Sequence, residues 1–188
     1  MEKRGYLIVG VIIIFLLILI SFRFTNKDTE NIGQTSEQQT EPNIELKLEL
    51  ESQSFTNNAQ IPLIYTCDGE DISPPLEINN IPENTKSLVL IVDDPEKTWV
   101  HWVVWNIPMT NLIQENSVPQ GAIQGINDFG EKNYRGPCPP SGTHRYFFKL
   151  YALDSILDLE ENSDNQELET TMQDYIIDQT ELIGLYGE

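Results

Sequence analysis

The sequence predicts a mostly β domain, a β-sandwich, that is preceded by a single transmembrane helix. Two observations support this prediction. From Ile44 onward, short runs rich in β-branched and aromatic residues alternate with Pro, Gly, Asn and Asp, a spacing typical of sandwiches. Before that point, Gly5–Phe22 is an uncharged apolar run of 18 residues. As a helix it would span about 27 Å, close to the hydrocarbon thickness of a bilayer.

The chain divides by composition into four segments. Residues 1–4 form a short tail, 5–22 the anchor, 23–43 a polar linker and 44–188 the folded domain. No small-residue cleavage site follows the apolar run, so we expect an uncleaved anchor. A very short leading tail usually stays in the cytoplasm. The sequence therefore predicts a single-pass protein of the cell membrane, with a flexible linker and an extracytoplasmic domain.

The predicted domain is strongly acidic. From residue 44 onward there are 7 Lys and Arg and 25 Asp and Glu residues, which gives a net charge of −18. The net charge of the whole chain is −19. A hydrophobic content of 39% is sufficient for a packed core, so the acids are expected on a solvated surface. This charge argues against nucleic acid as a partner.

Four runs carry the strand pattern. Ile44–Glu51 alternates apolar and polar residues and predicts a half-exposed strand. Ser87–Asp93 and Trp99–Ile107 are apolar at nearly every position, which predicts strands buried on both faces. In His144–Leu153, alternation places two polar rings and three apolar side chains on one face. These five are His144, Tyr146, Phe148, Leu150 and Ala152.

One helix is expected near the C-terminus. Asn165–Gln179 carries apolar residues at helical spacing, with Ser163 or Asp164 available as its cap. A last short strand, Glu181–Tyr186, should follow. The apolar positions in this helix pattern are Leu168, Met172, Tyr175 and Ile176.

The two histidines, His101 and His144, each lie in an aromatic strand just after a turn rich in Pro, Gly or acids. A single histidine there is more often an ordinary core residue, but two in the same setting favour a ligand pocket. The loop Gly136–Gly142 has prolines for rigidity and glycines for close backbone approach, so its amides are candidates to hold an anion. Candidate lining residues are Trp99, Trp102, Trp105, Phe148 and Tyr151, and candidate donors include Arg145 and Tyr146.

Two of these regions resemble a known family. Asp93–Pro108 and Gly136–Asp154 are similar to the signature regions of the phosphatidylethanolamine-binding protein family, in its prokaryotic Raf-kinase-inhibitor-like branch. Further similarity extends over Thr66–Leu76, Asn127–Gly130 with Tyr134, and Glu181–Tyr186. The resemblance implies a Greek-key β-sandwich with one or two peripheral helices. It also implies a small pocket for phosphate-type anions and phospholipid headgroups.

Carried over motif by motif, the resemblance implies six ligand-binding residues: Asp94, Glu96, His101, Gly136, His144 and Tyr146. Trp99, Arg145 and Cys138 would surround them, with Arg145 on the opposite strand face. The chain departs from the family at Asp94–Thr98, where Asp-Pro-Glu-Lys-Thr stands in place of Asp-Pro-Asp-Ala-Pro. The longer acid and the added Lys change the side-chain length and the charge at the pocket rim. The resemblance therefore does not identify the headgroup that binds.

The favoured function is therefore a binding module for a small anion, with no catalysis, cofactor or metal. We expect its affinity for phosphate to rise below about pH 6.5, where histidine is protonated. The alternative is a protein-interaction module that inhibits an extracytoplasmic protease or another partner. A hydrolase using His101 or His144 as base and Ser141 or Cys138 as nucleophile is less favoured, because no recognisable catalytic constellation accompanies them.

The two cysteines, Cys67 and Cys138, leave alternatives open. Together with both histidines they are suitable zinc ligands, but they lack the short-spaced pairs of structural sites. Outside the cytoplasm they are able to form a disulfide, and the other alternative is two buried free thiols.

Overall fold

A computed structural model of the chain describes residues 46–188, which belong to one compact unit. The described part contains nine strands, one α-helix and two short 3-10 helices. The strands are β1 Glu49–Glu51, β2 Ala59–Gln60, β3 Leu76–Asn79, β4 Ser87–Asp94, β5 Trp99–Ile107, β6 Leu112–Ile113, β7 Ile123–Gln124, β8 His144–Leu153 and β9 Ile176–Tyr186. The helices are α2 Asn165–Met172, η1 Leu63–Tyr65 and η2 Gln173–Tyr175.

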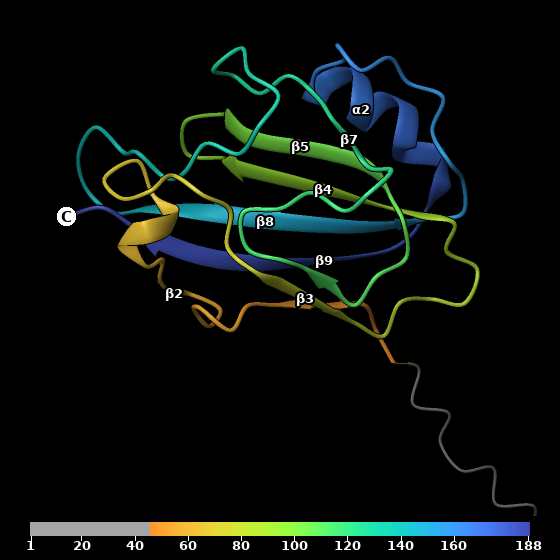
Figure 1. Cartoon of the computed structure of the whole chain (residues 1–188), viewed down its shortest axis with the longest axis horizontal. Coiled ribbons are helices and arrows are strands. Elements are labelled where there is room, and N and C mark those ends of the chain that lie inside the picture. Colours follow the sequence, from red (N-terminus) through yellow and green to blue (C-terminus); the bar gives the residue numbers. More distant parts are fainter. Residues whose placement is uncertain (1–45) are drawn as a thin grey trace, which may run out of the picture. The chain divides into compact units, whose positions relative to one another are not determined.

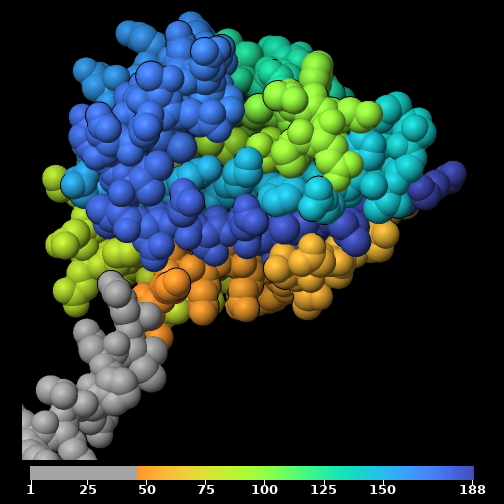
Figure 2. Space-filling model, turned by 180° about the vertical axis from the view of Figure 1, so that it is seen from behind, coloured from red at the N-terminus to blue at the C-terminus, as the bar shows by residue number. Residues whose placement is uncertain are grey.

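The strands form two sheets. The larger has six strands in the order β2-β9-β8-β4-β5-β7, and the smaller has three in the order β1-β3-β6. Neighbouring strands run antiparallel except β2 and β9, which run parallel. Figure 1 shows α2 on one side of the larger sheet and β3 on the other. From behind, β9 (dark blue) crosses the molecule above the orange residues of the first strands (Figure 2).

The larger sheet is buried on both faces. One face packs against the smaller sheet, and Leu90 of β4 and Ile78 of β3 meet in this core. The other face packs under α2, where Ile91 of β4 meets Leu168. Both faces of β4 and β5 are therefore shielded from water, which confirms what their nearly continuous apolar runs predict.

The pairing of β4 with β5 contains an irregularity that matters for function. Val92 lies opposite Trp102, and Asp93 lies opposite Val100, so His101 has no partner across the ladder. This is a β-bulge, which inserts one residue and changes the direction of the side chains around it. Bulges are common beside functional sites for this reason.

The predicted helix is too long. Asp164 caps it as expected, accepting a hydrogen bond from the Glu167 amide at 3.0 Å, but α2 ends at Met172 and β9 begins at Ile176. The reason is tertiary: β9 pairs with β8 along its length, from Ile176 opposite Leu153 to Tyr186 opposite His144. This ladder satisfies the backbone groups that a longer helix would have used.

The first predicted strand is shorter than its sequence pattern. Strand β1 covers only Glu49–Glu51, and Leu46 is 67% exposed although Leu48 and Leu50 are buried. Strands β4, β5 and β8 match their predicted runs closely.

One part of the predicted fold class requires correction. No helix within residues 46–188 has the length and apolar character needed to cross a bilayer, so the transmembrane helix is removed from the fold class, which is a mostly β sandwich. The predicted tail, anchor and linker (1–4, 5–22 and 23–43) lie outside the described residues.

Candidate functional site

The end of β4 and the start of β8 bring an acid and a histidine together. His144 Nδ1 lies 2.6 Å from Asp94 Oδ2, and both side chains are nearly fully buried. The second carboxylate oxygen, Oδ1, accepts a hydrogen bond from the Glu96 amide at 3.0 Å, which shapes the turn after β4. Because a carboxylate only accepts, Nδ1 is the donor and Nε2 of His144 is left to meet a ligand.

The second histidine is held in the same manner. His101 Nδ1 lies 2.8 Å from the carbonyl oxygen of Arg135, and the residue is 4% exposed. Burial lowers the pKa of His101 below its usual value, and the Arg135 carbonyl and the charge of Asp94 oppose this shift without cancelling it. The ring is therefore neutral at pH 7, with its proton on Nδ1 and a lone pair on Nε2.

Tyr146 lies between the two histidines. Its ring meets His101 edge to face at a centroid distance of 5.3 Å and is stacked with His144 at 6.4 Å. Burial, followed by the charge of Asp94, raises the pKa of Tyr146, while a hydrogen bond with the Cys138 backbone opposes this shift. The hydroxyl is thus protonated at physiological pH and available as a donor.

A buried asparagine organises the loop that holds His101. Asn127 donates from Nδ2 to the carbonyls of His101 (3.2 Å) and Asn133 (2.9 Å). Its Oδ1 accepts from the amides of Phe129 and Glu131, both at 3.0 Å. This positioning role is not predicted by the sequence pattern, although an Asn in a Gly-containing loop between strands is a signal for it.

The backbone around position 136 is packed so closely that only a glycine fits there. A Cβ at this position would lie 2.5 Å from the carbonyl oxygen of Tyr65 and 2.7 Å from the Cα of Thr66. Its amide donates to Asp71 Oδ1 at 2.5 Å, and Asp71 also pairs with Arg135 at 3.0 Å. The Gly136 amide is therefore engaged by Asp71, and sequence analysis gave no role to this acid.

The rim of the site is charged and aromatic. Arg145 Nε pairs with Glu96 Oε1 at 3.0 Å, and both side chains are exposed. Trp99, 41% exposed, meets Phe129 edge to face at 5.6 Å, and Phe129 in turn meets His101 at 5.4 Å. The site thus has a polar centre and an exposed aromatic pair at its edge.

Comparison with known proteins identifies the family. The family model described as phosphatidylethanolamine-binding protein matches residues 51–187. The chain belongs to this family. A UPF0098 protein from Methanothermobacter thermautotrophicus is 47% identical over 148 residues, covering 74% of this chain and 98% of that protein. A UPF0098 protein from Pyrococcus horikoshii is 48% identical over 147 residues, covering 72% of this chain and 74% of that protein.

Solved structures show the same fold. A phosphatidylethanolamine-binding protein homologue from Chlamydia trachomatis has a TM-score of 0.72 and 40% identity, covering 76% of this chain and 98% of its own. Escherichia coli YbcL, described as a member of the mammalian family, has a TM-score of 0.72 and 29% identity, with coverages of 76% and 99%.

Of the residues that the family resemblance implicates, four converge in the centre: Asp94, His101, His144 and Tyr146. Glu96, Trp99 and Arg145 lie at the rim, and Arg145 is on the strand face opposite the histidines, as expected. Trp105 and Tyr151 pack on the α2 side of the sheet and so do not line the site. Trp102 and Phe148 belong to the core between the sheets.

The two cysteines form a disulfide beside the site, with Cα atoms 5.5 Å apart. The bridge joins the segment after η1 to the Gly136–Gly142 loop, and the Cys67 amide also donates to the Pro137 carbonyl at 3.2 Å. Both sulfurs are thereby removed as zinc ligands, and Cys138 is removed as a nucleophile.

Proposed function

We propose that this domain binds a small phosphate-type anion, free or as a headgroup, at Nε2 of His101 and His144, and that it does so without catalysis. The observation that carries this proposal is the matched anchoring of the two rings. Each is fixed through Nδ1, by a carboxylate at His144 and by a carbonyl at His101, so that Nε2 is the free position on both. The hydroxyl of Tyr146 supplies a third polar group between them.

Binding should be coupled to proton uptake. In its neutral form His101 offers a lone pair at Nε2, which repels an anion, whereas the protonated ring offers an N–H. Because burial lowers the pKa of His101, the proton is gained below the ordinary value near 6.5 in the free domain. We therefore place the rise in anion affinity at a lower pH than the sequence alone suggested. A bound anion favours the charged ring and raises this pKa again.

The test is calorimetric titration of the full chain with inorganic phosphate and with phosphoethanolamine. His101→Ala and His144→Ala should each weaken binding by about tenfold or more, an energy of about 1.4 kcal/mol. Lys86→Ala is the control, since this residue is charged and exposed but lies at the other end of β4 from Asp94, and it should stay within about threefold. Repeating the titration in buffers of different ionisation enthalpy should reveal proton uptake. If both histidine variants bind phosphate as the wild type does, the proposed site is wrong.

We also propose that the domain works outside the cytoplasm. A disulfide closing a long segment of chain persists in oxidising compartments and is rare where glutathione keeps thiols reduced. The prediction is that protein from gently lysed cells, alkylated at once under denaturing conditions without reductant, takes up no label on Cys67 or Cys138. Two labels per chain before reduction would contradict an oxidising location.

A protein-binding function remains the second proposal, favoured by the exposed aromatic pair at the rim. Trp99 and Phe129 present apolar surface next to the anion site, and aromatic side chains are common anchors of protein interfaces. The Trp99→Ala variant should weaken inhibition of a protease from the same compartment while leaving phosphate affinity nearly unchanged. Loss of phosphate binding alone would assign Trp99 to the anion site.

A further inference from the structure

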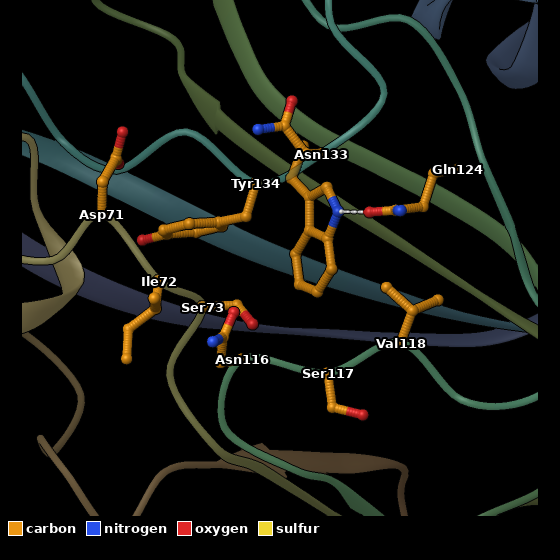
Figure 3. A pocket seen from close by; sticks show the side chains of 10 residues that line it. Asp71, Ile72, Ser73, Asn116, Ser117, Val118, Gln124, Asn133 and Tyr134 are labelled. Carbon is orange, nitrogen blue, oxygen red and sulfur yellow. Dashed lines mark hydrogen bonds between the residues drawn. The ribbon is translucent and has the colours of Figure 1, made fainter.

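One cavity of the domain is lined by Trp102, the neighbour of His101 in β5. It has a volume of about 270 Å³. Its ten lining residues come from the loops before β3, between β6 and β7 and after β7, and from strands β5 and β7, and Figure 3 shows their side chains. They are Asp71, Ile72, Ser73, Trp102, Asn116, Ser117, Val118, Gln124, Asn133 and Tyr134. Neither histidine lines it.

The lining of the cavity contains a single charged side chain, and that side chain already has partners. Asp71 is its one acid, and that carboxylate already accepts from the Gly136 amide at 2.5 Å and pairs with Arg135 at 3.0 Å. Burial raises the pKa of Tyr134 well above its usual value, so this phenol is neutral, and its hydroxyl donates to the Tyr65 carbonyl at 2.9 Å. An anionic ligand would lose its hydration here without gaining a cationic partner, and a cationic ligand would have to compete with Arg135 and the Gly136 amide for the Asp71 carboxylate.

The remaining polar lining consists of neutral groups that both donate and accept. The amide oxygen of Gln124 accepts from Trp102 Nε1 at 2.7 Å, the dashed line in Figure 3, and this leaves its NH₂ group for a ligand. Asn116, Asn133 and Ser117 are exposed and present amide and hydroxyl groups around the opening. Such groups match hydroxyls, which are themselves donors and acceptors.

Part of the lining is apolar and well ordered. Trp102 is 1% exposed, and its indole is held by Gln124 and by an edge-to-face contact with Tyr134 at 5.6 Å. Ile72 and Val118 complete the apolar lining. A lining of aromatic and aliphatic carbon with a few orienting polar groups is the general form of a small-molecule site. At about 30 Å³ per water the cavity has room for about nine waters, or one small ring with its substituents.

We infer that this cavity is a binding site for an uncharged, hydroxyl-rich ring compound about the size of a monosaccharide. The fixed Trp102 and Tyr134 rings and Val118 would contact the carbon-bound hydrogens of the ring, and Gln124 and Asn116 would bind its hydroxyls. This site is independent of the anion site proposed above, because it shares neither histidine with it.

The test follows the indole N–H resonance of Trp102 in the full chain by NMR, during titration with methyl β-D-glucopyranoside, N-acetylglucosamine and myo-inositol. Glucuronate and glucosamine serve as charged counterparts. At least one neutral probe should shift the Trp102 resonance in a saturable manner, with an affinity about tenfold or more above its charged counterpart. Equal affinity for charged and neutral probes, or no saturable shift with any neutral probe, would overturn the proposal.

Two variants test whether the neutral probe binds in this cavity. Ser117→Trp fills the opening from an exposed position and should weaken binding of the neutral probe by about tenfold or more. Ser117→Ala keeps the space and should change the affinity by no more than about threefold. Both should bind inorganic phosphate as the wild type does, which verifies folding. Retained binding of the neutral probe in the Trp variant would locate that ligand elsewhere and refute the proposal.

Discussion

Removing the disulfide should lower the stability of the domain by an amount that follows from the length of chain it closes. Cys67 and Cys138 are separated by 71 positions. In the chain-entropy model, cross-linking a segment of this length removes conformational freedom from the unfolded state worth about 4 kcal/mol at 25 °C. For a domain with the roughly 143 residues described, this corresponds to a lower Tm by about 14 °C.

The folded site should nevertheless keep its geometry without the bridge. The Cys67 amide still donates to the Pro137 carbonyl at 3.2 Å, and Tyr134 still donates to the Tyr65 carbonyl at 2.9 Å. These bonds tie the same two segments together. The phosphate affinity of the folded protein should therefore change by less than about threefold, since the bridge acts mainly on the unfolded state.

The assay is urea unfolding of the Cys67→Ser, Cys138→Ser double variant beside the oxidised wild type, followed by phosphate titration of each. Wild type kept in reductant is the control and should unfold like the double variant. A stability difference below about 1 kcal/mol would refute the entropic account. An affinity loss of about tenfold or more would instead show that the bridge shapes the anion site.

Three further predictions concern single positions. Gly136→Ala should lower stability by about 2 kcal/mol or more, because a Cβ would lie 2.5 Å from the Tyr65 carbonyl oxygen; thermal unfolding beside the wild type measures this, and an unchanged Tm would contradict the close packing. Leu150→Ala removes a fully buried side chain from the core between the sheets and should cost about 2 to 5 kcal/mol in urea unfolding; a smaller loss would mean that the core collapses around the gap. Because the pKa of His101 is lowered on folding, the unfolded chain takes up a proton near pH 6.5 that the folded chain does not. Stability should thus fall as the pH drops from 7.5 through 6.5, and His101→Gln should flatten this part of the profile; an unchanged slope would contradict the assigned shift.

The local sequence pattern was sufficient to predict the long inner strands. Strands β4, β5 and β8 are continuous apolar or strictly alternating runs, so their type and their extent could be read from the sequence. The same pattern put His144 and Tyr146 on one face and Arg145 on the other, as the burial of β8 confirms. The pattern failed from Ile176 to Gln179, where helical spacing was overridden by the ladder with β8.

The candidate site was predictable only in part. The histidines and Asp94 were identified because their motifs are similar to those of a known family. The positioning residues Asn127 and Asp71 were not, since their roles consist of hydrogen bonds to backbone groups of other segments. The bulge at His101 was equally hidden, because an extra residue in a strand is defined only by the partner strand that it faces.

By itself, the sequence determined that this protein has a mostly β domain of a recognisable family, with an acidic surface and two histidines set in its inner strands. These properties follow from composition and from periods of a few residues, which are local. The tertiary structure decided that Nδ1 of each histidine is engaged, that the Gly136 amide is bound by Asp71, and that Trp102, Gln124 and Tyr134 line a cavity. Each of these depends on contacts between segments tens of residues apart, and such contacts exist only once the sheets have packed.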